Sequence, residues 1–121
     1  MKVKTSELSG KALDWAVIKA SNFPVMMHEG RFVSYDMEMD AYVIIQPSVA
    51  WSQCGAMIAR FGMTITPASS DRTEWMARFS ENEEMLDGFG STPQIAICRA
   101  VVAAKLGDEV DIPNELMEVG E

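Results

Sequence analysis

The chain has 121 residues, 48% of them hydrophobic, and a formal net charge of −8 at pH 7. This length and composition predict one domain over residues 1–121 and argue against disorder. No apolar run approaches the ~20 residues of a membrane span, and the first residues lack the apolar segment of a secretory signal, so we expect a cytoplasmic protein without membrane contact. Cys54 and Cys98 are far apart and form no Cys-x-x-Cys motif, which predicts reduced, buried thiols.

The negative charge is concentrated in the last third of the chain. Residues 1–80 carry eight acidic and eight basic side chains, whereas residues 81–121 carry ten acidic side chains and two basic ones. This pattern argues against direct nucleic-acid binding, which needs a clustered basic surface. It fits either a solvated face that aids solubility or an acidic surface that docks on a basic partner. The candidate docking residues are Glu81, Glu83, Glu84, Asp87, Asp108, Glu109 and Asp111.

The spacing of apolar residues predicts a first helix over residues 5–20. Trp15 falls in the apolar stripe of this helix, so we expect it to anchor the core. Lys11 and Asp14 fall on the outer side. Pro24 follows the helix, in keeping with a helix that ends shortly before it.

Two alternating segments, residues 25–28 and 31–35, flank Gly30 and predict a hairpin in which Gly30 has a positive φ. The three carboxylates of residues 36–40 occupy alternate positions and would share one face of an extended strand. Their spacing does not fit a calcium-binding EF-hand loop, so we expect no metal there. Residues 42–46 predict a further short strand.

Residues 47–62 predict a loop that leads into a short helix, with Ser48 as a possible cap and Gly62 as a possible stop. A second hairpin follows, in which residues 63–66 pair with residues 73–79. The odd-numbered side chains from Trp75 to Phe79 are expected to face the helices. Residues 80–90 are acidic and glycine-containing, which predicts a loop.

The central helix is predicted over residues 91–106, because this stretch is apolar around most of its circumference. Ser91 and Gln94 have the spacing of a capping box, a proline occupies the first turn, and Gly107 follows the last turn. Residues 108–121 are expected to form a partly ordered acidic tail.

Together these elements predict an α+β fold. We expect a small antiparallel sheet with two long helices, residues 5–20 and 91–106, packed on one face, and a short extra helix.

Three blocks of the sequence together resemble the NinX family of small phage proteins. The blocks are residues 1–17; Pro47-Ser48, Trp51, Gln53, Gly55, Ile58, Arg60 and Gly62; and Thr92-Pro93, Ala96, Arg99 and residues 105–110. Residues 96–100 are also similar to the end of the phage α-β-α sandwich domain, whereas residues 25–46 are least similar to the family. The resemblance implies a phage or prophage origin and expression in the bacterial cytoplasm. It assigns no activity and passes on no catalytic residues.

Catalysis finds no support in the sequence. Phosphate-binding loops, paired cysteine and histidine ligands and a Gly-x-Ser-x-Gly motif are all absent, and His28 is the only histidine. We therefore expect a protein that is not an enzyme and that holds neither a metal nor a cofactor.

Two kinds of binding function remain. The first is an accessory protein that binds and blocks a host protein, such as a CRISPR or restriction complex, and it is suggested by the phage resemblance and the acidic last third. The ten methionines suit adaptable interfaces, and the strand edges of the hairpins could also pair in a homodimer. The alternative is a protein that binds a nucleotide signal, in which Tyr35 and Trp51 stack on the base and Gln53 and Arg60 hold its polar groups.

Overall fold

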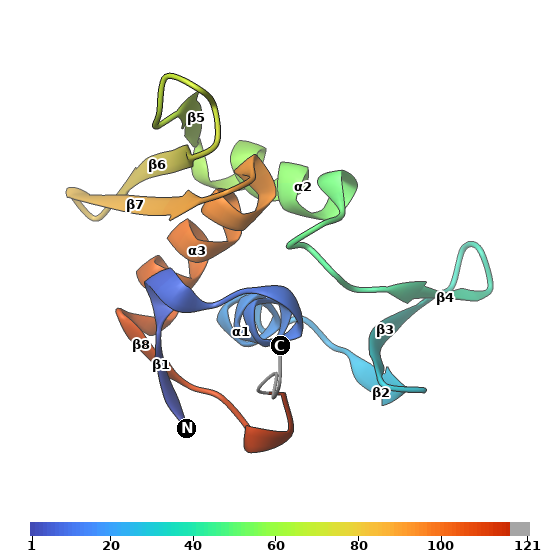
Figure 1. The fold of residues 1–121 in the computed structure, drawn as a ribbon. Helices are drawn as coiled ribbons and strands as arrows, with labels where there is room; N and C mark the ends of the chain where they lie inside the picture. Colours follow the sequence, from blue (N-terminus) through green and yellow to red (C-terminus); the bar gives the residue numbers. More distant parts are fainter. Residues whose placement is uncertain (117–121) are drawn as a thin grey trace.

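The computed structural model describes residues 1–116 (Figure 1). In chain order its elements are β1 Lys2–Lys4, a 3-10 turn Thr5–Glu7, α1 Gly10–Ser21, β2 Met26–His28, β3 Arg31–Asp36, β4 Ala41–Ile44, α2 Trp51–Phe61, β5 Thr64–Pro67, β6 Trp75–Glu81, β7 Glu84–Gly90, α3 Pro93–Leu106, β8 Glu109–Asp111 and a 3-10 turn Asn114–Leu116. Within this part of the chain, no helix is long and apolar enough to cross a membrane.

The α+β class is confirmed, but the single predicted sheet is wrong. The strands form three separate antiparallel sheets, β1-β8, β2-β3-β4 and β5-β6-β7. Short turns join antiparallel neighbours, and here α1 separates β1 from β2 while α2 separates β4 from β5. α1 and α2 therefore bound the β2-β3-β4 sheet in the chain, α2 and α3 bound the β5-β6-β7 sheet, and β1 pairs with β8 across almost the whole chain (Figure 1).

α3 is the centre of the core, as predicted. It contacts β6 and β7 on one side and α1 and α2 on others. Its fully or almost fully buried side chains are Ala96, Ile97, Cys98, Ala100, Val101 and Val102.

Two glycines of β7 let α3 lie very close to the sheet. A Cβ atom at Gly88 would come within 2.2 Å of the Ala96 carbonyl oxygen and 2.4 Å of the Ala100 nitrogen. A Cβ atom at Gly90 would come within 2.5 Å of the Ile95 side chain. Glycine in a strand often marks such a close backbone approach.

The ends of the two long helices differ from the prediction. Thr92, not Ser91, is the N-cap of α3, and its hydroxyl oxygen accepts a hydrogen bond from the Ile95 N–H at 3.2 Å. α1 begins at Gly10, after the 3-10 turn Thr5–Glu7, with Ser9 as its N-cap, and Thr5 bonds to the segment after α3. The Thr5 N–H donates to the Asp108 carbonyl at 2.7 Å and its hydroxyl donates to the Gly107 carbonyl at 2.6 Å.

Two side chains of α1 also lie differently from their predicted positions. Trp15 is half-buried and packs against the edge of the core rather than filling its centre. Asp14, expected on the outer side, is only 6% exposed. Its carboxylate accepts a hydrogen bond from the Ser48 N–H, so this helix face meets a polar group of a distant segment.

The second hairpin is confirmed, with β5 paired to β6 and with Ala77 and Phe79 buried. The predicted acidic loop over residues 80–90 is wrong. β6 extends to Glu81 and pairs with β7 along the whole of that strand. Asn82 and Glu83 form the turn with φ angles of 52° and 65°, as a tight hairpin requires.

The predicted tail contributes to the described fold. β8 pairs with β1, and Val110 and Ile112 are buried members of the core. Residues 117–121 of that tail lie outside the described part of the chain.

Candidate functional site

β2, β3 and β4 form a small sheet that projects from the rest of the molecule (Figure 1). We call residues 23–45 the arm. The β2–β3 turn has φ angles of 53° at Glu29 and 75° at Gly30, which confirms the predicted hairpin. No residue of the arm belongs to the central core cluster of the described chain, and Phe32 and Val33 are its buried side chains.

Exposed apolar side chains gather on the arm. Eight of the fourteen large exposed apolar side chains in residues 1–116 belong to it, although it is a fifth of that length. They are Phe23, Met26, Met27, Tyr35, Met37, Met39, Tyr42 and Val43. Single exposed apolar residues are ordinary on protein surfaces, but a contiguous group marks a surface that binds something.

Three exposed rings form a row across one face of the arm. Tyr35 is directly opposite Tyr42 in the β3–β4 pairing, and their ring centroids are 5.3 Å apart in an edge-on arrangement. Tyr42 also stacks on His28 with the centroids 5.8 Å apart. Such ring pairs stabilise one another beyond the burial of their surface, which favours this arrangement of the three side chains.

The outer end of the arm carries the carboxylates of residues 36–40. They do not share a strand face as predicted, because β3 ends at Asp36 and the next four residues turn. The Asp36 Oδ1 atom accepts hydrogen bonds from the N–H groups of Glu38 at 2.9 Å and Met39 at 3.3 Å. A side chain that bonds the backbone two residues on is a common way to close a turn.

The base of the arm is held by side chains from the two neighbouring helices. The Gln53 Nε2 atom donates to the Ile44 carbonyl, and its Oε1 atom accepts from the Gln46 N–H, both at 2.7 Å. Lys11 donates to the Gly30 carbonyl at 2.5 Å. These contacts fix the direction in which the arm leaves the body.

The four predicted ligand-binding residues are not brought into one pocket. Gln53 and Arg60 line the same hollow between α1 and α2, which measures about 300 Å³. Trp51 is exposed at the first turn of α2 and Tyr35 belongs to the arm, and neither lines that hollow. The polar ends of Gln53 are already occupied by backbone groups.

The predicted acidic docking residues are divided between several places. Three of them form ion pairs: Glu81 with Lys105 at 3.0 Å, Asp87 with Arg78 at 2.6 Å, and Asp111 with the N-terminal amino group at 2.9 Å. Of the other four, Glu83 is in the β6–β7 turn and Glu84 begins β7, while Asp108 precedes β8 and Glu109 begins it. Pairing neutralises part of the charge that the sequence concentrates here.

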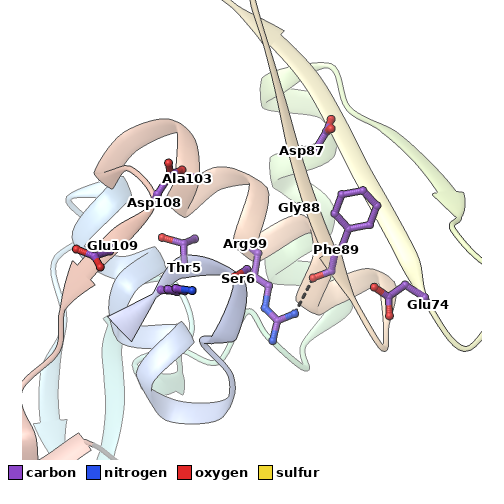
Figure 2. Close-up of a pocket in the computed structure, with 11 residues that line it drawn as sticks. Thr5, Ser6, Glu74, Asp87, Gly88, Phe89, Arg99, Ala103, Asp108 and Glu109 are labelled. Atoms are coloured by element: carbon purple, nitrogen blue, oxygen red, sulfur yellow. Dashed lines mark hydrogen bonds between the residues drawn. The ribbon is translucent and has the colours of Figure 1, made fainter. Parts of the chain in front are cut away.

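A cavity of about 850 Å³ lies between the first residues, β7 and α3 (Figure 2). Figure 2 shows Arg99 in its middle, with Glu74 and Glu109 on opposite sides. Arg99 donates to the Leu8 carbonyl at 2.9 Å and to the Phe89 carbonyl at 2.7 Å, and burial lowers the pKa of its guanidinium. Four carboxylates and two cations line the cavity, an excess that disfavours an anionic ligand such as a nucleotide phosphate.

One comparison with known proteins decides the family. The family model described as "Bacteriophage P22, NinX" matches residues 4–105, which include the arm, α1, α2, all of α3 except its last residue, and the cavity's Arg99. The chain belongs to the phage P22 NinX family. No curated protein matches the sequence. The match confirms the family resemblance, and it stops before β8, the strand that pairs with β1.

Three titratable side chains of this NinX chain, Cys54, Cys98 and Asp14, are buried inside the fold. Cys54 and Cys98 are both free and buried, as predicted, and burial raises the pKa of each thiol, which makes it less nucleophilic. Burial also raises the pKa of Asp14 to about 6, although its hydrogen bond from Ser48 opposes this rise. Within residues 1–116, no three His, Cys, Asp or Glu side chains gather as a metal ion would require.

Sequence reasoning missed the arm as the candidate site of this NinX chain. Tyr35 was proposed there, but for its ability to stack on a base. The available signal was the density of methionines, since Met26, Met27, Met37 and Met39 fall within fourteen residues. No local pattern in the sequence indicated that Asp14 is buried, because its hydrogen-bond partner is the Ser48 N–H, 34 residues away.

Proposed function

We propose that this NinX-family protein is a non-catalytic phage accessory protein that binds a host protein through the arm and thereby blocks it. The observation that carries the proposal is the gathering of exposed methionine and tyrosine side chains on one projecting sheet. Aromatic residues and methionine are enriched at protein interfaces, and charged residues are depleted at interface centres. On the arm, β2 exposes Met26 and Met27, β3 exposes Tyr35, and β4 exposes Tyr42 and Val43.

Covering the exposed apolar side chains of the arm would contribute enough free energy for a partner to be recognised. Covering an exposed apolar side chain contributes roughly 1.5–3 kcal/mol when burial is complete, and the arm side chains are about half exposed. Four such residues at an interface centre therefore contribute several kcal/mol. The flexible thioethers of methionine allow the surface to fit a partner that is not perfectly complementary.

The class of partner follows from the phage family. A phage protein made in a bacterial cytoplasm meets host proteins at high concentration, and blocking a defence complex of the restriction or CRISPR type needs binding and no chemistry. The nucleotide-binding alternative is less well supported. Its four proposed residues are dispersed, and the cavity around Arg99 carries an excess of carboxylates.

Site-specific photocrosslinking tests the proposal. A benzoylphenylalanine residue replaces Tyr42 in the arm or, as the matched control, Met85 on β7, which is exposed to a similar degree. Both proteins are expressed in a bacterial host and irradiated. We expect a discrete adduct with one host protein from the Tyr42 position and none from the Met85 position.

Purified components then measure the contribution of the arm. The double variant Met26→Ser/Met27→Ser should bind the crosslinked host protein about tenfold or more weakly, and Met85→Ser should bind like the wild type. Equal losses in both variants, or adducts from the Met85 position alone, would refute the arm as the binding surface. An adduct of two copies of this chain would identify a homodimer instead of a host partner.

A further inference from the structure

The arm carries a hollow that extends from its base to the turn of residues 36–40, and this hollow combines apolar surface with negative charge. It measures about 510 Å³. We call it the arm hollow, and its lining residues used below are Phe23, Tyr35, Asp36, Met37, Glu38 and Val43. The lining contains two carboxylates and no basic side chain.

The two carboxylates of the arm hollow are available to a partner. Neither Asp36 nor Glu38 forms an ion pair with another side chain of the described chain. The turn holds Asp36 in place through Oδ1, which leaves Oδ2 without a hydrogen bond from residues 1–116. A fixed carboxylate loses little conformational freedom on binding, which favours a direct ion pair.

The apolar part of the lining is also open. Met37 is 85% exposed, and the rings of Tyr35 and Phe23 are about half exposed. A purely apolar side chain seated here would remove both carboxylates from water without pairing them, which is costly. An acidic side chain would add repulsion.

Arginine and lysine side chains match both parts of the lining. Each has an apolar stem that covers hydrophobic surface while its cationic end reaches a polar group. The cation can pair with a carboxylate through a charge-assisted hydrogen bond and can lie against an aromatic ring. A second copy of the chain fits poorly, because the arm itself carries four acidic residues and one basic residue.

We infer that the arm hollow receives an arginine or lysine side chain of the partner, so that the partner presents basic residues beside an apolar patch. This inference rests on the proposed function of the arm and adds the chemistry of the partner. It places the acidic recognition element on the arm instead of the last third of the chain.

The test uses the full chain labelled with ¹⁵N and three acetylated hexapeptides, in which leucine alternates with arginine, glutamine or glutamate. We expect the arginine peptide to shift the amide signals around Asp36 and Glu38 most strongly. Its dissociation constant should rise with salt concentration, because the contact is partly ionic. The glutamate peptide should not bind there.

Two double variants separate specific recognition from the general attraction of an acidic protein for a basic peptide. Asp36→Asn/Glu38→Gln removes two charges from the arm hollow and keeps the oxygen that closes the turn. Asp108→Asn/Glu109→Gln removes two charges from exposed positions beside β8. The first variant should weaken binding of the arginine peptide about tenfold and the second by less than about twofold.

The outcomes are distinguishable from those of the crosslinking experiment. Equal binding of the glutamine and arginine peptides at the arm would overturn the inference and leave the arm as a docking surface. Equal weakening by the two double variants would also overturn it. A crosslinked host partner whose affinity is unchanged by Asp36→Asn/Glu38→Gln would do so as well, whereas loss of that affinity would support it.

Discussion

Replacing Asp14 by asparagine tests the energetics of the segment that leads from the arm to α2. The Asp14 carboxyl is 6% exposed and accepts a hydrogen bond from the Ser48 N–H at 2.8 Å. Burial raises its pKa from 3.8 to about 6. The native state therefore holds a proton that the unfolded chain releases between these two pH values. The stability contributed by the proton is fully present below pH 3.8 and is lost as the pH rises through 6.

The magnitude follows from the two pKa values. A tenfold change in proton affinity is worth about 1.4 kcal/mol, so the ionised carboxylate costs up to about 3 kcal/mol above pH 6. The asparagine side chain keeps an oxygen for the Ser48 N–H and carries no charge. Asp14→Asn should therefore raise the free energy of unfolding by about 1–3 kcal/mol near neutral pH and by almost nothing near pH 3.

Urea unfolding followed by tryptophan fluorescence measures the free energy of unfolding of the wild type and of Asp14→Asn at a series of pH values. Subtracting the wild-type value from the variant value at each pH cancels the contributions of the other titrating groups. Asp108→Asn, at an exposed position, is the control and should change the free energy of unfolding near neutral pH by less than about 0.5 kcal/mol. The reasoning is refuted if the Asp14→Asn difference does not change with pH. It is equally refuted if the variant is less stable near neutral pH, since the hydrogen bond to the ionised carboxylate would then outweigh its burial.

Two further substitutions test the placement of α3. Gly88→Ala should lower the free energy of unfolding by about 3 kcal/mol or more, because the new Cβ atom would meet the backbone of Ala96 and Ala100, which has no flexible end to move aside. A loss below about 1 kcal/mol in urea unfolding would contradict this close approach. Thr92→Ala should cost about 1 kcal/mol as the loss of a helix cap, whereas Ser91→Ala should cost less than about 0.5 kcal/mol, and the reverse order would restore the predicted cap.

Local signals in the sequence were sufficient for most of the elements. The long apolar stretch before Gly107 predicted α3, and the residues around Gly30 predicted the β2–β3 hairpin, because helix ends and tight turns depend on residues close in sequence. The same dependence on local residues explains why the sequence did not predict β7. Its acidic residues disfavour a strand locally, and the pairing with β6 and the packing under α3 override that preference.

The arrangement of the sheets and the candidate site depend on contacts that no local signal reports. Val3 pairs with Val110 across almost the whole chain, and Asp14 meets Ser48 through the backbone. The exposure of Met26 and Tyr42 is also a property of the assembled fold, because alternating apolar residues in a strand usually face a core. The sequence pattern of the arm is that of a buried sheet, and only the structure shows that no helix within residues 1–116 covers most of it.

The close packing of α3 against Gly88 and Gly90 has a consequence for re-engineering this protein. The helix rests directly on the strand, and the core cluster around it draws on no residue between 23 and 45. The interior and the projecting sheet are therefore separate modules that share little packing. A chimaera that carries this segment from another NinX sequence should keep its interior intact while acquiring a different choice of partner.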